Sequence, residues 1–319
     1  MKVLVTGGAG FIGSHVADAY LAAGHDVWIV DDLTSGRREN VPADARFIEL
    51  SIADAALEDV FRDAGGFDVV NHHAAQIDVR RSVSDPRFDA AVNIDGLLNV
   101  LERARTHGTG RVVFVSSGGV VYGEPETRPT PETAPKLPRS PYGVTKLAAE
   151  HYLYYYHTVH QLEYAALRYA NVYGPRQDPH GEAGVVAIFS TRLLEERPLT
   201  VFGDGLQTRD YVFVGDVVAA NLLLTGAELP PAAGLDERAF NVGTGVETSV
   251  LELADTLMEA SGRRVPVEHA EARPGELRHS ALDAARLCAL GWTPGVSLTE
   301  GLGRTFTHIA RERGVEVGA

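Results

Sequence analysis

The chain has 319 residues, 45% of them hydrophobic, and a formal net charge of −14 at pH 7. This composition is ordinary for a globular protein with a core, and the acidic balance argues against a nucleic-acid partner. No apolar run approaches the roughly 18 residues of a membrane span, and the chain opens on a strand-like segment, not a signal peptide. The single cysteine, Cys288, excludes an internal disulfide. We expect a soluble, cytoplasmic α/β protein with Cys288 packed in its core.

The first 31 residues have the pattern of a dinucleotide-binding unit. A buried strand over 2–6 is followed by a glycine turn, a helix of period 3.6 that ends before Gly24, and a second strand ending in Asp31. The turn reads Gly7-Gly8-Ala9-Gly10-Phe11-Ile12-Gly13. Its glycines let backbone N–H groups approach a pyrophosphate at the positive end of the helix. Asp31 suits the ribose hydroxyls of NAD, whereas nearby Arg37 and Arg38 keep NADP as the alternative.

Further α/β units continue the parallel sheet. A strand over 46–50, a helix over 55–61 and a strand over 68–70 lead into Asn71-His72-His73-Ala74-Ala75. Neighbouring residues on a strand point to opposite faces, and no third ligand is evident, so the paired histidines do not predict a metal site. A turn of small residues at the carboxyl end of a strand instead predicts ligand contact.

A long helix is expected from Asp85-Pro86 to about residue 105, with Asn93 inside it. The next buried strand, 111–115, ends in Ser116 and Ser117. These hydroxyls fall at the same edge of the sheet as the other strand ends, where they can meet the residues that follow. The proline- and glutamate-rich stretch 124–139 reads as a surface loop.

The segment Ser140-Pro141-Tyr142-Gly143-Val144-Thr145-Lys146 opens a run of good helix formers. Tyr142 and Lys146 are four residues apart, so they share one helix face. A lysine ammonium beside a phenol favours the phenolate, and Tyr142 is therefore a candidate base near neutral pH, well below its free pKa of about 10.

After a strand over 163–168 the character of the chain changes. Glycines, prolines and polar residues dominate 171–184, and arginines occur in turn-like pieces at Arg176, Arg209 and Arg273. Guanidinium groups suit phosphate oxygens. We expect an NAD-binding domain over 1–170, to which segments near 210–245 return, and a smaller nucleotide-sugar-binding α/β domain over 171–319.

The glycine turn, the serine pair, Tyr-x-x-x-Lys and Arg-Tyr-Ala-Asn-Val-Tyr-Gly-Pro together resemble the extended short-chain dehydrogenase/reductase family, and within it the UDP-glucose 4-epimerases. The resemblance implies a doubly wound Rossmann fold, tightly bound NAD, and a UDP-sugar that is oxidised and reduced at C4. It implies catalytic roles for Tyr142, Lys146 and Ser117 or Ser116. It implies cofactor contacts at Gly7, Gly10, Phe11, Ile12, Gly13, Asp31, Ser51, Ile52, His72, Ala74, Ala75, Asn93, Tyr142, Lys146 and Tyr169. It implies substrate contacts at Ser117, Tyr142, Asn171, Val185, Val186, Phe202, Arg209, Arg273 and Ser280.

Departures from the family pattern occur at four positions. Gly118 stands where relatives place the active-site hydroxyl, so Ser117 or Ser116 must supply it, and Ser51 replaces an adenine-binding aspartate. Ile77 stands where a lysine is frequent. At the gate beside the sugar 2-substituent some members of the family carry a bulky tyrosine that excludes N-acetylated sugars, and Ser280 at this position implies room for them.

The family leaves other activities open. Dehydratases of this type carry an acidic pair where this chain has Gly118-Gly119, which disfavours water elimination. A decarboxylase or epimerase acting on UDP-glucuronate remains an alternative, and an NAD-sensing regulator is disfavoured because Tyr142 and Lys146 are both present. The resemblance also implies a homodimer built on the helices over 85–105 and 142–160, the second of which is rich in tyrosine.

Overall fold

The computed structural model describes residues 1–179, 184–272 and 277–316. The chain forms two compact units, each assembled from three segments. Unit 1 contains Met1–Val121, Lys136–Arg168 and Val218–Phe240, and unit 2 contains Tyr122–Pro135, Tyr169–Val217 and Asn241–Ala319.

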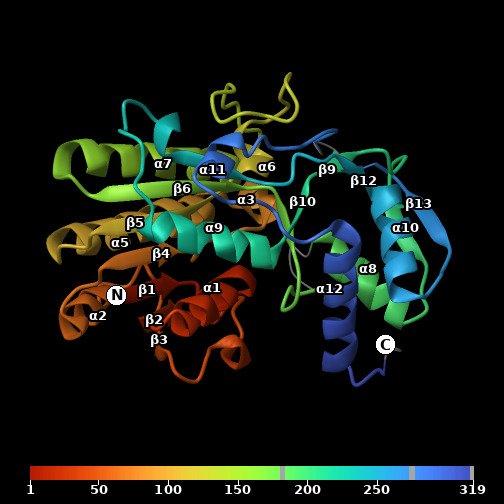
Figure 1. Cartoon of the computed structure of the whole chain (residues 1–319), viewed down its shortest axis with the longest axis horizontal. Helices are drawn as coiled ribbons and strands as arrows, with labels where there is room; N and C mark the ends of the chain where they lie inside the picture. Colours follow the sequence, from red (N-terminus) through yellow and green to blue (C-terminus); the bar gives the residue numbers. More distant parts are fainter. Residues whose placement is uncertain (180–183, 273–276, 317–319) are drawn as a thin grey trace. The chain divides into compact units, whose positions relative to one another are not determined.

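A seven-stranded sheet in the order β11-β6-β5-β4-β1-β2-β3 organises unit 1 (Figure 1). Its strands are β1 (Lys2–Thr6), β2 (Asp26–Asp31), β3 (Arg46–Glu49), β4 (Val69–His72), β5 (Arg111–Ser117), β6 (Glu163–Tyr169) and β11 (Ala239–Val242). β1 pairs in parallel with β2 on one side and with β4 on the other, so the strand order extends outward from β1 on both sides. This is the doubly wound order, whose ligand crevice opens where the strand order reverses. The fold class expected from the sequence is confirmed.

Helices cover both faces of this sheet (Figure 1). On one face lie α1 (Phe11–Ala22) and α9 (Val214–Gly226), where the Tyr20 hydroxyl is 2.5 Å from that of Thr225. On the other face α2 (Leu57–Ala64), α5 (Gly96–Thr106) and α7 (Pro141–His160) pack a continuous apolar core against the strands. Burial of that core is the main contribution to the stability of unit 1.

The long helix expected from Asp85 has a change of pitch inside it. It is built from α4 (Pro86–Ala90), a π-helical turn over Ala91–Asp95, and α5. The Asp85 side chain caps its N-terminus by accepting from the Phe88 N–H at 3.0 Å. Two short helices were not expected: α3 (Val79–Ser84), directly before it, and α6 (Gly118–Val121), after β5.

Unit 2 contains three two-stranded ladders and a layer of helices. The ladders pair β10 (Tyr211–Phe213) with β7 (Asn171–Tyr173), β12 (Thr248–Ser249) with β9 (Thr208–Arg209), and β13 (Val267–Ala270) with β8 (Leu199–Phe202). The helices are α8 (Val185–Leu194), α10 (Val250–Ser261), α11 (Ala285–Ala289) and α12 (Leu298–Glu312), and α12 packs against both α8 and α10. A capping box between Ser249 and Glu252 begins α10.

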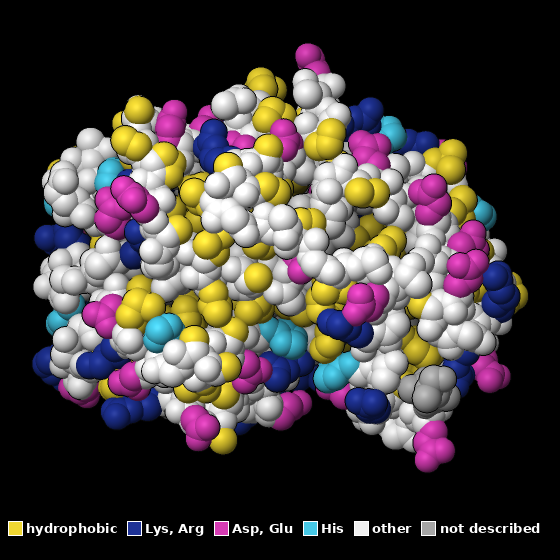
Figure 2. Space-filling view, viewed as in Figure 1, with side chains coloured by type: hydrophobic (Ala, Val, Ile, Leu, Met, Phe, Trp, Pro, Cys, Tyr) yellow, Lys and Arg dark blue, Asp and Glu magenta, His cyan; other side chains and the backbone are white. Residues whose placement is uncertain are grey.

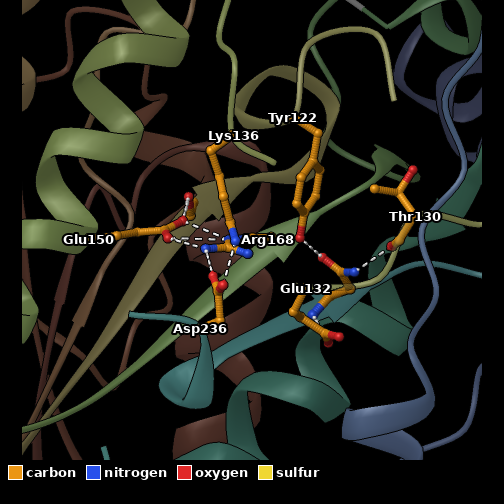
Figure 3. A network of polar contacts seen from close by, with 9 residues as sticks. Tyr122, Thr130, Glu132, Lys136, Glu150, Arg168 and Asp236 are labelled. Carbon is orange, nitrogen blue, oxygen red and sulfur yellow. Dashed lines mark hydrogen bonds and ion pairs between the residues drawn. The ribbon is translucent and has the colours of Figure 1, made fainter. Parts of the chain in front are cut away.

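The stretch expected to be a surface loop is anchored inside unit 2. Thr130 and Glu132 are buried, and the Asn241 side chain donates to the Thr130 carbonyl at 2.8 Å (Figure 3). The Asn241 N–H donates to Glu132 Oε1 at 2.9 Å, and the Tyr122 hydroxyl donates to Asn241 Oδ1 at 2.8 Å. Asn241 thus pairs with buried polar groups of three residues in this part of the chain, Tyr122, Thr130 and Glu132.

Two expectations from composition concern exposure. Cys288 is exposed on α11, so its placement in the core was wrong. Acidic side chains are spread among lysines and arginines over the face seen in Figure 2. None of the helices in the described part of the chain is long and apolar enough to cross a membrane.

Candidate active site

The glycine turn after β1 is shaped for close backbone approach. Gly7 has φ +69°, and a Cβ there would lie 2.6 Å from the Ala74 nitrogen. A Cβ on Gly13 would collide with the Gly7 carbonyl. Gly10 caps α1 without any side-chain hydrogen bond, which leaves the first N–H groups of the helix available to a phosphate. Larger residues would fill this cradle, so the turn fits a dinucleotide.

Asp31 closes the cradle at the end of β2. Its carboxylate accepts from the Ala9 N–H at 3.0 Å and from the Leu33 N–H at 2.9 Å, which fixes it against the glycine turn. Burial raises its pKa from the ordinary value, opposed by these two hydrogen bonds. The Arg38 guanidinium lies 4.5 Å from the centre of the Phe47 ring, where it is held by a cation–π contact.

The paired histidines at the end of β4 differ in their partners. His72 is buried, with Nδ1 2.8 Å from the Thr6 hydroxyl, and stacks on Phe114. Both ring nitrogens of His73 are buried without a hydrogen-bond partner among the described residues. Burial lowers the pKa of each histidine to about 3, helped by the nearby Lys146 charge, so both rings are neutral. An orphaned neutral imidazole beside the glycine cradle also fits a polar cofactor.

The Tyr142–Lys146 pair lies in the first turns of α7. Ser140 caps this helix by accepting from the Gly143 N–H at 3.1 Å, and Pro141 occupies its first turn. Lys146 is buried, donates to the Val115 carbonyl at 2.9 Å and lies 5.8 Å from the centre of the Tyr142 ring. Burial lowers the Lys146 pKa to about 8, and the carboxylates of Asp89 and Glu150 oppose that change. A cation beside a phenol is the arrangement that favours a phenolate base.

The two candidate serines differ because one of them joins the buried network of Glu150, Arg168 and Asp236 (Figure 3). The Ser116 hydroxyl is buried and donates to Glu150 Oε1 at 2.5 Å. Glu150 also receives Arg168 Nε and Nη2, and Arg168 continues to Asp236 at 3.1 Å. The Ser116 side chain is therefore committed to an internal network, and Ser117 is the better candidate for a hydroxyl that meets substrate.

Other expected cofactor residues of unit 1 follow the strand ends. Ser51 accepts from the Ala53 N–H at 3.4 Å, and Ile52 is buried against Gly96. The Asn93 amide is engaged by the protein itself, since it donates to the Gln76 carbonyl at 3.0 Å and accepts from the Gln76 N–H at 2.9 Å.

The expected substrate residues in the second half belong to unit 2, as does Tyr169. Asn171 begins β7, Phe202 ends β8, and Val185 and Val186 form the first turn of α8. The strand that carries Arg209 lies beside the segment leading to the buried Ser280, because the Thr208 N–H donates to the Arg278 carbonyl at 3.0 Å. Arg273 lies outside the described residues.

Sequence reasoning missed three buried groups around Lys146. The sequence patterns assign no role in the site to His73, Glu150 or Asp89. Asp89 and Glu150 are both almost completely buried. A charged residue on the buried face of a helix would have pointed to them. The sequence alone does not determine which face of these helices is buried.

The doubly wound sheet, the glycine cradle and the Tyr142–Lys146 pair define a dinucleotide-dependent enzyme that moves hydride and protons. The NAD dependent epimerase/dehydratase family matches residues 3–243. A UDP-glucose 4-epimerase of Mycolicibacterium smegmatis is 49% identical over 311 residues, which cover 96% of this chain and 97% of that protein. The chain belongs to the NAD dependent epimerase/dehydratase family.

Solved structures agree with this assignment. The UDP-glucose 4-epimerase of Thermotoga maritima, solved with UDP-glucose, is 45% identical with a TM-score of 0.93, covering 98% of this chain and 100% of that one. The UDP-glucose 4-epimerase of Thermus thermophilus, solved in complex with NAD, is 45% identical with a TM-score of 0.90, covering 97% of this chain and 99% of that one.

Proposed function

We propose that this protein interconverts UDP-glucose and UDP-galactose at C4 of the sugar, through a transient 4-keto sugar and with NAD retained between turnovers. The observation that carries the proposal is the Lys146 ammonium, buried against Tyr142 at the carboxyl edge of the sheet. The identity of 49% to a UDP-glucose 4-epimerase over nearly the full length supports the same reaction.

Each catalytic group has a defined task in this reaction. Tyr142 takes the proton of the sugar 4-hydroxyl and later returns it, so acid and base are the same group. Lys146 stabilises the phenolate, and the hydroxyl of Ser117 donates to the sugar O4. When bound, NAD would supply the redox chemistry, as the acceptor of hydride from C4 and its donor to the opposite face of the 4-keto sugar. The electron and proton count returns to its starting value after each turnover.

The glycine cradle, Asp31 and the neutral imidazole of His73 are the groups that would hold NAD. Asp31 presents carboxylate oxygens to the ribose hydroxyls, and its negative charge disfavours a 2′-phosphate. Arg38, one of the two arginines that keep NADP as an alternative, packs on Phe47. This supports NAD as the cofactor.

We infer a broader substrate range from the gate. Ser280 is small and buried, and a serine leaves room for a 2-acetamido group where a tyrosine would not. UDP-N-acetylglucosamine and UDP-N-acetylgalactosamine are therefore proposed as additional substrates. UDP-glucuronate is the alternative substrate if neither sugar pair reacts.

The test uses the purified protein with no added NAD. Incubation with UDP-galactose and UDP-N-acetylgalactosamine, followed by proton NMR, should convert both to their gluco epimers. Conversion of UDP-galactose alone would contradict the gate, as would a Ser280→Tyr variant with unchanged activity on the N-acetyl sugar. Failure of both, even after NAD is added, would contradict the 4-epimerase proposal and direct the assay to UDP-glucuronate.

A homodimer is proposed on the outer face of α7. Tyr155 is 47% exposed and Tyr152 37%, and Val144 and Val159 are more than half exposed along the same helix. Aromatic and aliphatic side chains of this kind are enriched in interfaces. Sedimentation should give a dimer at micromolar concentration and a lighter species for Tyr155→Glu, and a monomeric wild-type protein would refute the proposal.

A further inference from the structure

Asp89 is a fully buried carboxylate, and no cation is bonded to it among the residues that the structure describes. It lies on α4 with 0% exposure and accepts from the Gln76 side-chain amide at 2.9 Å and the Asn93 amide at 3.1 Å, both on Oδ1. Its other oxygen accepts from the Thr145 hydroxyl at 2.8 Å. All three donors are neutral. Removing a carboxylate from water is costly when no positive charge compensates it, so the position calls for an explanation.

The π-helical turn helps to bring these groups together. It begins directly after α4 and contains Asn93, whose amide reaches back to Asp89 and across to the Thr145 hydroxyl at 3.3 Å. Turns of this kind widen a helix locally and occur often at functional sites.

Thr145 connects the carboxylate to the reacting turn of α7. Its hydroxyl also lies 3.0 Å from the Tyr142 carbonyl, and Lys146 is its neighbour in sequence. The hydrogen bond from Thr145 to Asp89 therefore restrains the one helical turn that carries both the proposed base and its cation.

The ionisable groups around Lys146 come from four parts of the chain. Glu150, on α7, is neutralised by the two-pronged contact of Arg168 from β6. His72 and His73 approach from β4 as neutral rings. Asp89, from α4, has no cation of its own in the described part of the chain, and with Glu150 it opposes the lowering of the Lys146 pKa by burial.

We propose that Asp89 is a positioning residue of the reaction, whose carboxylate holds the turn of α7 that carries Tyr142 and Lys146 through the Thr145 hydroxyl and places a negative charge behind that turn. The inference rests on the proposed roles of Tyr142 and Lys146 and adds the group that maintains them. A residue with a purely structural role, joining α4 to α7, would need the hydrogen bond but not the negative charge. Variants that remove the charge alone therefore distinguish a structural role from the proposed one.

The test separates charge from hydrogen bonding with matched variants. Asp89→Asn keeps the shape and removes the charge, Asp89→Glu keeps the charge, and Thr145→Val removes the hydroxyl alone. Asp95→Asn removes a carboxylate from the exposed side of the same helix and serves as the control. The pH dependence of kcat/KM for UDP-galactose is measured for each, with circular dichroism to verify folding.

The acid limb of the profile should move to higher pH by about one unit or more in Asp89→Asn, because loss of the ammonium disfavours the phenolate. In Asp89→Glu the acid limb should lie at the same pH as in the wild type. Thr145→Val should lower kcat several-fold without a shift of the acid limb, and Asp95→Asn should match the wild type in both. A uniform loss in Asp89→Asn with an unmoved limb would overturn the proposal.

A second readout does not depend on the substrate. The tyrosinate absorbance near 295 nm is titrated with and without Tyr142→Phe, and the difference reports Tyr142 alone. Its midpoint should rise in Asp89→Asn even if the true substrate is another nucleotide sugar. An unchanged midpoint would overturn the role of Asp89 and leave the proposed epimerase activity intact.

Discussion

At the scale of single residues, the mechanism that we propose depends on the hydroxyl of Tyr142. Lys146 lies beside its ring and is held there by a hydrogen bond to the Val115 carbonyl. Preorganised groups of this kind need no rearrangement when charge develops. Removal of the phenolic oxygen should therefore affect turnover and not binding.

Tyr142→Phe should lower kcat by about 10²–10⁴-fold, the range for loss of a general acid–base group. NAD content after purification should stay the same, because the ring and Lys146 remain. Tyr154→Phe removes a hydroxyl from the same helix at a position packed against the core, and it should behave as the wild type. Full turnover in Tyr142→Phe would exclude the mechanism for any substrate.

Arg168 is the residue whose loss should cost most stability. It is completely buried and neutralises Glu150, which is 1% exposed. Arg168→Leu should reduce the free energy of unfolding by about 3–5 kcal/mol, because a buried carboxylate loses its partner. The double variant Arg168→Leu, Glu150→Gln should recover part of the loss, as measured by urea unfolding. Equal stability of the single and double variants would contradict this pairing.

At the scale of elements, the glycine turn and α1 act together as one cofactor-binding element. The fold requires no Cβ at Gly13, because one would collide with the carbonyl of Gly7. The absence of a side chain at Gly13 thus allows the turn to fold, and it also leaves the backbone N–H groups open to the dinucleotide.

Gly13→Ala should reduce the NAD that copurifies with the protein, and the loss should exceed any change in folded content. The matched control is Gly303→Ala, a helical glycine of α12 with open space around its Cβ position. That change should leave NAD content unaltered and raise stability by up to about 1 kcal/mol. NAD content is read from absorbance after acid release, and an undiminished value in Gly13→Ala would count against the cradle.

Elements with strong local signals were predictable from the sequence. The glycine turn and the run of good helix formers that begins after Ser140-Pro141 predicted α1 and α7, and both helices occur where expected. The burial of Asp89 could not be predicted, because an aspartate early in a helix is also what an exposed helix start favours. The anchoring of Thr130 and Glu132 by Asn241 depends on partners more than a hundred positions away, which no local pattern reveals. The role of Ser116 depends likewise on Glu150.

At the scale of the whole molecule, acid sensitivity should come in part from His72. Its folded pKa is about 3, below the ordinary value of about 6.5. Between these pH values the unfolded chain binds a proton on this histidine that the folded protein does not bind. The contribution of His72 to the free energy of unfolding is therefore fully present above pH 6.5, and it is lost as the pH falls toward 3.

His72→Asn should flatten this dependence, because asparagine keeps a polar group near Thr6 and does not titrate. Urea midpoints measured from pH 4.5 to 7.5 give the slope for each protein. His151→Asn, an exposed position on α7, should leave the slope unchanged. An equally steep slope in His72→Asn would assign the acid sensitivity to other groups.

The chain passes five times between its two units, after Val121, Pro135, Arg168, Val217 and Phe240. Neither unit corresponds to a continuous stretch of the gene, so any fragment that contains the whole of one unit also carries two segments of the other. Recombination between relatives would have to exchange three separate segments at once to transplant one unit intact. Specificity in this lineage is therefore expected to change by point substitution, at positions such as Ser280, more readily than by shuffling of modules.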